Sequence, residues 1–142
     1  MNKWMASFHL KFPVELIMSL LLILFFAHEF FTPYFYTDNY LKQAGLEKIE
    51  IYQQLSNTEL RGEERAELAE EAVVKGLAEA YSAMEIYPTF SVLEQVEIKD
   101  VTRSFYQYKL VVEGQHHDQE LANTFTFQKD GLEFKINGFS MR

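Results

Sequence analysis

The sequence has no cysteine in its 142 residues. The chain therefore forms no disulfide, carries no lipid anchor on a cysteine and uses no cysteine nucleophile. This absence does not identify the compartment. Common catalytic signatures are missing too: there is no Walker loop, no Gly-x-Ser-x-Gly, no His-Glu-x-x-His and no dinucleotide-binding glycine pattern. We therefore expect no enzymatic activity, no metal and no cofactor.

Basic residues are fewer than acidic ones, 13 against 21, which gives a net charge of −8. Two lysines and two glutamates cancel within residues 1–37, so the whole excess of negative charge lies in residues 38–142. An acidic surface argues against nucleic acid and anionic lipid headgroups as partners of this part of the chain. Its length, about 105 residues, is enough for one modest hydrophobic core.

One apolar run without charge stands out, LIMSLLLILFFA from Leu16 to Ala27. Its length also fits the apolar core of a cleavable signal peptide. Cleavage needs small residues before the cut, but Phe25 lies two positions before Ala27, and Phe30 has the same relation to Thr32. We therefore expect the segment to be retained as a membrane anchor.

The predicted transmembrane helix covers residues 14–36. A helix of this length spans about 34 Å, enough for a hydrocarbon core of about 30 Å. We expect Glu15 at one membrane face and His28 and Glu29 toward the other, where water reaches them; a functional role inside the membrane is the alternative. The second face carries an aromatic belt made of Phe30, Phe31, Tyr34, Phe35 and Tyr36.

The flanking charges predict the orientation of this helix. Lys3 and Lys11 precede it, whereas Glu29 and Asp38 are the first charges on the far side. The positive-inside rule then makes residues 1–13 a cytoplasmic tail and residues 37–142 an outer domain. In a bacterium the protein would be a single-pass inner-membrane protein with a periplasmic domain.

The outer domain begins with residues that favour helices. Residues 37–39 (Thr-Asp-Asn) are good N-caps, and Pro33 lies one turn earlier, where it can kink the exit. Residues 40–44 fit a short helix that Gly45 would close. Residues 46–55 have both helical and strand-like spacing, and we favour helix.

Ser56 and Glu59 fit a capping box, which predicts a helix that ends before Pro88. Its polar side includes Glu67, Glu70 and Glu71, a candidate docking surface for a basic partner; a solvated helix face is the alternative. Its apolar stripe has helical spacing and comprises Ala66, Ala69, Val73, Leu77, Ala80, Tyr81 and Met84.

After Pro88 the apolar residues alternate with period two, which is typical of strands. Four strands are predicted, over residues 92–99, 104–113, 121–128 and 132–136, with a turn at 114–119 and a hairpin at Lys129-Asp130-Gly131. The fold class is therefore α+β: an N-terminal transmembrane helix, then helices packed on a four-stranded antiparallel meander.

This order of elements resembles the nuclear-transport-factor-like and cystatin-like folds, in which a curved meander wraps helices. With its single anchor, the layout is similar to inner-membrane components of type IV secretion systems. It is also similar to small periplasmic subunits that partner transmembrane transcription activators. The resemblance rests on the layout of residues 14–142, and it implies no functional residue.

Proteins of the nuclear-transport-factor-like fold often have a pocket between sheet and helix. Tyr106, Tyr108, Asn123 and Phe125 are predicted to face inward there and are candidate ligand-binding residues for an apolar molecule; a filled core is the alternative. No inward position of the predicted strands is Asp, Glu or His, so a general base has no evident place.

His116, His117 and Asp118, with Glu120 close by, are the one group of metal-ligand residue types. Adjacent histidines on a turn do not readily face one ion, and no spacing places a third ligand. We interpret this group as a polar turn.

We therefore expect a membrane-anchored accessory or assembly subunit of an envelope complex, which binds another protein through its outer domain. Confinement to the membrane plane lets a modest interface suffice. The first strand or the last, residues 132–139, could also pair with a partner strand if its edge is exposed. Two alternatives stay open: a sensor subunit that holds an apolar small molecule, and an enzyme of the ketosteroid-isomerase type.

Overall fold

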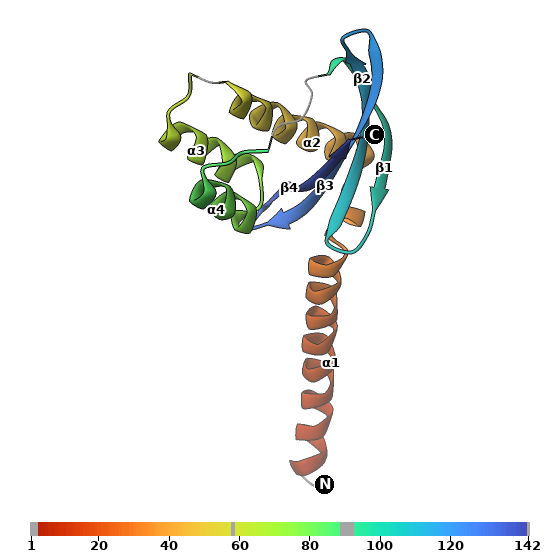
Figure 1. Ribbon diagram of the computed structural model, residues 1–142. Helices are drawn as coiled ribbons and strands as arrows, with labels where there is room; N and C mark the ends of the chain where they lie inside the picture. Colours follow the sequence, from red (N-terminus) through yellow and green to blue (C-terminus); the bar gives the residue numbers. More distant parts are fainter. Residues whose placement is uncertain (1–2, 58, 89–92, 142) are drawn as a thin grey trace.

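The computed structural model describes residues 3–57, 59–88 and 93–141, with residues 3–12 as backbone only (Figure 1). A long helix stands below a small domain in which helices lie against a twisted sheet. The elements are α1 (Lys3–Phe30), η1 (Thr32–Phe35), α2 (Asp38–Gln53), η2 (Gln54–Ser56), α3 (Gly62–Ala72), α4 (Lys75–Met84), β1 (Glu94–Arg103), β2 (Gln107–His116), β3 (Gln119–Asp130) and β4 (Glu133–Met141).

The N-terminal helix α1 contains an 18-residue stretch, Pro13–Phe30, that is long and apolar enough to cross a membrane. The rest of the protein buries none of this stretch. The structure differs from the predicted span of 14–36, because α1 begins upstream of Pro13 and ends at Phe30. The Thr32 hydroxyl donates hydrogen bonds to the carbonyls of His28, at 2.5 Å, and Glu29, at 3.0 Å. Pro33 then offers no N–H, so the helix cannot continue.

Helix α2 is continuous, whereas the sequence predicted a helix closed at Gly45 and a second segment after it. Thr37 is its N-cap, as predicted, and accepts a hydrogen bond from the Tyr40 N–H at 3.3 Å. Gly45 lies inside the helix at its closest approach to the sheet. A Cβ there would lie 2.4 Å from Leu110 Cδ1 and 3.1 Å from Phe127 Cζ. Glycine thus lets α2 pack directly on the sheet.

The single helix predicted from Ser56 onward is two helices, α3 and α4. Ser56 belongs to η2, and the N-terminal cap is instead Arg61, whose N–H donates to Glu64 Oε2 at 2.9 Å. Between the helices Val73 is extended and pairs with Ile136 of β4, and the Val74 N–H donates to the Ile136 carbonyl at 3.0 Å. The break resets the helical period, so Ala80 and Met84 of the predicted stripe are exposed.

The four strands form one antiparallel sheet in the order β1-β2-β3-β4, which confirms the predicted meander and the α+β class. The predicted strand residue Val92 lies outside the described residues. Gly114 is part of β2 and not of the turn, and a Cβ there would lie 2.7 Å from Leu93 Cβ. The turn is His117-Asp118, both with positive φ.

The hydrophobic core lies between one face of the sheet and the helices. Helix α2 crosses the sheet, α3 packs against α2 and β4, and α4 packs against α3 (Figure 1). The predicted inward residues Tyr106 and Leu132 are exposed because both belong to hairpin turns that precede the strands. The largest fully buried apolar side chains include Tyr52, Tyr108, Phe125, Phe127, Leu41, Leu110 and Ile136.

Candidate functional site

The outer domain is tied to the end of α1 through Arg103, the last residue of β1. Its guanidinium donates to the carbonyls of Pro33, at 3.1 Å, and Tyr36, at 3.0 Å, and forms an ion pair with Asp38. In return the Tyr34 hydroxyl donates to the Arg103 carbonyl at 3.2 Å. One planar side chain thus holds η1, the start of α2 and β1 together.

A second ion pair joins the sheet to helix α1 itself. Lys129 near the end of β3 contacts Glu29 of α1 at 2.9 Å, and its N–H donates to the Tyr106 carbonyl in the β1–β2 hairpin. Phe105 of that hairpin lies against Phe31, with ring centroids 5.2 Å apart. The β1–β2 and β3–β4 hairpin turns are therefore placed at the upper end of α1.

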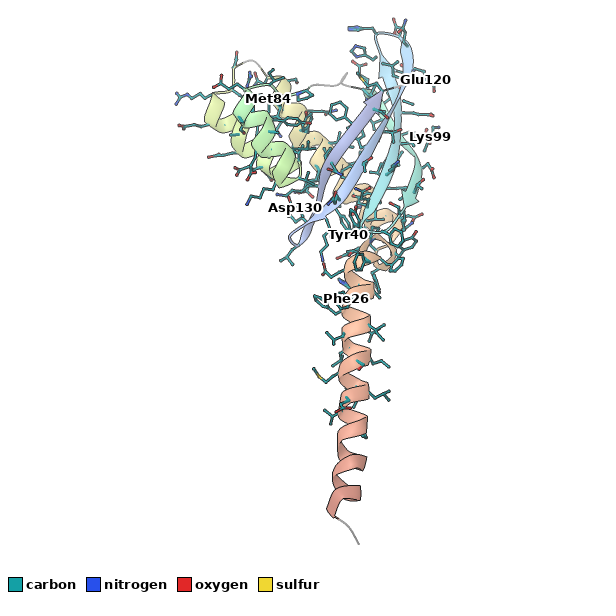
Figure 2. The ribbon with its side chains drawn as sticks, turned by 60° about the horizontal axis from the view of Figure 1, so that its bottom comes forward. Phe26, Tyr40, Met84, Lys99, Glu120 and Asp130 are labelled. Atoms are coloured by element: carbon teal, nitrogen blue, oxygen red, sulfur yellow. The ribbon has the colours of Figure 1, made fainter. Side chains whose placement is uncertain are left out.

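These turns expose apolar side chains at the level where α1 ends. Phe105 is 59% exposed, and Leu132, in the β3–β4 turn, is 97% exposed. Residues Phe31, Tyr34 and Phe35 are exposed beside them. Figure 2 shows this cluster of side chains around the junction, with Tyr40 next to it and Met84 far from the membrane helix.

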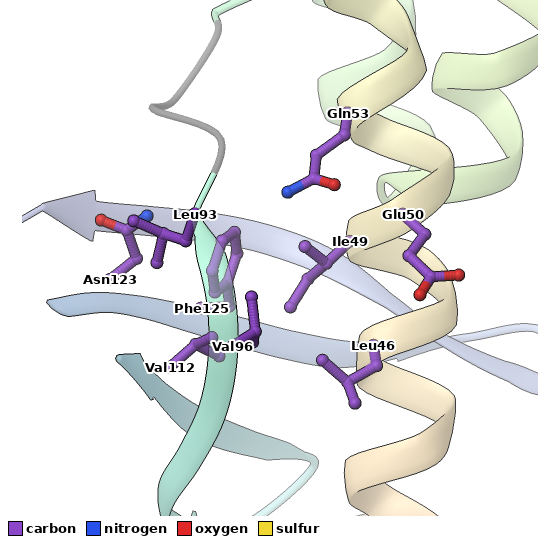
Figure 3. Close-up of a pocket in the computed structure, with 9 residues that line it drawn as sticks. All are labelled: Leu46, Ile49, Glu50, Gln53, Leu93, Val96, Val112, Asn123 and Phe125. Atoms are coloured by element: carbon purple, nitrogen blue, oxygen red, sulfur yellow. The ribbon is translucent and has the colours of Figure 1, made fainter. Parts of the chain in front are cut away.

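A cavity of about 300 Å³ opens between α2 and the sheet (Figure 3). Ile49, Val112 and Phe125 line its buried part, while Val96 and Glu50 are exposed at its mouth. Leu46 and Gln53 of α2 and Leu93 and Asn123 complete the described lining. Its surface is mostly apolar, with a few polar groups, as is usual for small-molecule sites.

Asn123 is the buried polar residue of this cavity. Its side chain is 1% exposed, and neither Nδ2 nor Oδ1 has a hydrogen-bond partner within the described parts of the chain. It faces inward because it stands opposite Val112 of β2 and alternates with Thr124 along β3. A buried amide without partners is costly, and native proteins retain few such groups.

The other candidate ligand-binding residues lie in different places. Phe125 lines the cavity beside Asn123. Tyr108 is fully buried in the core, stacks on Phe127 and donates its hydroxyl hydrogen bond to the Leu41 carbonyl at 3.1 Å. Tyr106 is in the β1–β2 turn at the membrane junction.

Sequence reasoning did not include the lining residues that α2 and the start of β1 contribute. The sequence shows that the apolar residues among them are regularly spaced. Whether they contact β2 and β3 depends on how α2 crosses the sheet. The cavity also contains one acid, Glu50, among its described lining residues. This carboxylate is exposed on α2 and not on the sheet.

The candidate partner surface is a coherent face of α3. Glu67, Glu70 and Glu71 follow a spacing of three and four residues, so they lie on one side of the helix, and all three are exposed. The Glu70 carbonyl accepts a hydrogen bond from Lys135 at 2.6 Å. Helices α3 and α4 lie beside the sheet and away from α1 (Figures 1 and 2).

The two edges of the sheet differ. The β4 edge is occupied at its centre by Val73 and Val74. The β1 edge has two register irregularities and the charged residues Glu97, Lys99 and Asp100. Bulges and charges are features that hinder edge-to-edge pairing. This argues against β1 as the main surface for a partner strand.

The His116-His117-Asp118 group lies at the end of β2 and in the β2–β3 turn, and the two imidazole rings contact each other with centroids 4.2 Å apart. Within the described residues no three His, Cys, Asp or Glu side chains are grouped to hold a metal ion.

Comparison with protein-family models, with curated proteins and with solved structures gives no match to this chain.

Proposed function

We propose that the protein is a membrane-anchored accessory or assembly subunit of an envelope complex, which acts by binding another protein. Its α1 helix would span the inner membrane of a bacterium, with the N-terminus in the cytoplasm and the α+β domain in the periplasm. In this proposal the chain has the layout of the inner-membrane components of type IV secretion systems, or of the periplasmic subunits that partner transmembrane transcription activators.

The observation that carries the proposal is the tie between the outer domain and the anchor. Arg103 of β1 and Lys129 of β3 bind groups in η1 and at the end of α1, from two strands that are separated by β2. A flexible linker between anchor and domain would be enough if the domain only had to stay near a membrane. Two charged contacts instead fix its orientation, which suits a domain that presents one particular face to a partner.

The anchor and the two hairpin turns together support contact with the bilayer surface. Aromatic and aliphatic side chains at the level of lipid headgroups are typical of membrane interfaces. Phe105 and Leu132 extend the predicted aromatic belt from the helix to the sheet. This contact is apolar and does not depend on attraction between the domain and anionic headgroups.

The face that we assign to a protein partner is the acidic side of α3. Helices α3 and α4 with the residues between and beside them, 61–86, contain seven glutamates against Arg61, Arg65 and Lys75. A basic surface on the partner would complement this face, accelerate association and fix the orientation of the complex.

The experiment is recovery of the partner from membranes solubilised in mild detergent, with the full chain as bait. Glu67, Glu70 and Glu71 are changed together to lysine, and recovery of the partner is expected to fall at least about tenfold. Recovery with the unaltered chain should also decline between about 0.1 and 0.5 M salt, because interfacial charges are screened.

A charge-matched control changes Glu47, Glu94 and Glu120 to lysine. These glutamates are exposed on α2, β1 and β3. The control should recover the partner as well as the unaltered chain. Both variants must melt cooperatively, since Glu70 is near Lys75 and Lys135 and its replacement adds repulsion there. Equal recovery by both folded variants would reject the α3 face.

A second candidate function has its own supporting observation, the cavity with Asn123. A molecule held there would make the protein a sensor subunit of the same complex. The cavity lies on the side of α2 that faces β1, apart from the acidic side of α3. An enzyme of the ketosteroid-isomerase type has less support, since the described acid of the cavity is the exposed Glu50 at its mouth.

A further inference from the structure

We infer that the cavity beneath α2 binds a small neutral amphiphile: an apolar chain or ring with one terminal group that both donates and accepts hydrogen bonds. A primary amide is the simplest member of this class. The inference rests on the sensor function above and is independent of the acidic side of α3, so either proposal can fail alone.

The lining determines the apolar part of the ligand. Leu46, Ile49, Val112 and Phe125 present aliphatic and aromatic surface from both layers of the domain. At about 300 Å³ the cavity is at the lower end of the range for ligand sites. A ligand of this size would be a short chain or a single ring.

Asn123 determines the polar part. Its amide offers two N–H donors and a carbonyl acceptor, and none of these has a partner within the described parts of the chain. A ligand group that only accepts would leave the Asn123 carbonyl unpaired, and a group that only donates would leave its N–H groups unpaired. A group that does both satisfies the side chain, and a site built in this way discriminates strongly against analogues without it.

The charge around the mouth determines the net charge of the ligand. Glu50 is exposed there, and the domain carries the whole net charge of −8. A carboxylate ligand would be repelled at the entrance, and inside it would find the donors of Asn123 but no cationic side chain among the described lining residues. A neutral head group avoids both penalties.

The test is a titration of the full-length, ¹⁵N-labelled protein in lipid nanodiscs, followed by NMR at the side-chain NH₂ group of Asn123. The probes are hexanamide, 2-heptanone and hexanoate, which have similar tails. Hexanamide donates and accepts, 2-heptanone only accepts, and hexanoate is charged at pH 7.4. Hexanamide should shift the Asn123 resonance saturably and bind at least about tenfold more tightly than the other two.

Two variants complete the test. Asn123→Leu keeps a side chain of similar volume but removes the amide, and should weaken hexanamide binding at least about tenfold. Asn137→Leu makes the same change on β4, outside the lining, and should leave binding unchanged. In both variants binding is followed at the backbone amide resonances of Ile49 and Val112, and a saturable shift there that is lost only in Asn123→Leu supports the inference. Three results would each overturn it: no saturable shift, equal binding of the three probes, or an Asn123 NH₂ group that contacts only water at every hexanamide concentration.

Discussion

The guanidinium of Arg103 forms an ion pair with Asp38, 65 residues earlier in the chain, at the start of α2. The same side chain binds two carbonyls of the segment that leaves the membrane helix. Arg103 therefore links the sheet, the first helix of the outer domain and the segment that follows α1, and its side chain is largely buried in doing so.

Replacing Arg103 by lysine should weaken this link, because an ammonium group cannot span all three acceptors with the geometry of a guanidinium. We expect a loss of about 1–2 kcal/mol in the unfolding free energy of the outer domain, measured by urea denaturation in detergent. Hydrogen exchange at residues 34–40 should accelerate at the same time. Lys109→Gln, on the exposed side of β2, should change stability by less than about 0.5 kcal/mol. Equal effects of the two substitutions would contradict the role given to Arg103.

Leu132 should lie at the bilayer surface. The only tryptophan of the chain, Trp4, is first changed to phenylalanine, and a new one is placed at Leu132 or, as a control, at Ile86. Both positions are exposed, but Ile86 follows α4, away from α1. Lipids brominated near the headgroup should quench the fluorescence of Leu132→Trp and leave Ile86→Trp nearly unaffected. Similar quenching at the two sites would rule out the proposed contact of Leu132 with the bilayer surface.

Gly45 and Gly76 should respond oppositely to alanine, although both are inside helices. A Cβ at Gly45 would collide with Leu110, so Gly45→Ala should cost about 1–3 kcal/mol of stability through overpacking. At Gly76 a Cβ meets no described atom within 4 Å, and Gly76→Ala should stabilise by about 0.5 kcal/mol because alanine favours helix. Thermal melts of the two variants give the comparison, and a neutral Gly45→Ala would show that α2 does not pack this closely on the sheet.

The outer domain should lose stability as the pH rises above about 10. Burial raises the pKa of Tyr108, and burial together with the charge of Tyr81 raises that of Tyr52. In the unfolded chain both tyrosines lose their protons near pH 10, whereas in the folded protein they keep them to higher pH. Their contribution is therefore complete below about pH 10 and declines above it, by up to about 1.4 kcal/mol per pH unit for each tyrosine.

Melting temperatures at pH 9, 10 and 11 test this dependence. The Tyr108→Phe variant should show a shallower decline above pH 10, because one buried tyrosine then no longer contributes. Its stability at pH 8 should be somewhat lower, since the Leu41 carbonyl loses its hydrogen-bond donor. A melting temperature that does not change between pH 9 and 11 would mean that these hydroxyls are not buried in the folded protein.

The sequence predicts those parts of the fold that depend on local patterns. The period-two pattern of inward- and outward-facing residues predicts which residues form the inner face of the sheet, from Tyr108 to Val112 and from Asn123 to Phe127. Thr37, a good N-cap, predicts the start of α2. Local patterns fail where a distant segment decides the conformation. Val73 and Val74 are extended because Ile136 offers them a strand edge. Gly45 lies within a helix and does not end it, because the sheet packs so close there that only glycine fits.

The candidate sites show the same division. Exposure of Glu67, Glu70 and Glu71 follows from helical periodicity, which relates neighbours on one element. The cavity forms only because α2 crosses over the sheet. Its lining residues Leu46, Ile49 and Leu93 are therefore brought together by tertiary packing and share no sequence pattern. Asn123 is different: a polar residue in an alternating apolar series could be identified from the sequence alone.

The central claim, that the anchored domain presents α3 to a protein partner, is tested most directly by photo-crosslinking in intact membranes. A benzophenone amino acid is placed at Glu71 on α3 and, in a second variant, at Glu120 on the opposite side of the domain. The account predicts one discrete adduct with a second protein from position 71, lost when Glu67 and Glu70 are changed to lysine, and none from position 120. An adduct from position 120 without one from position 71, or no adduct from either, would contradict it.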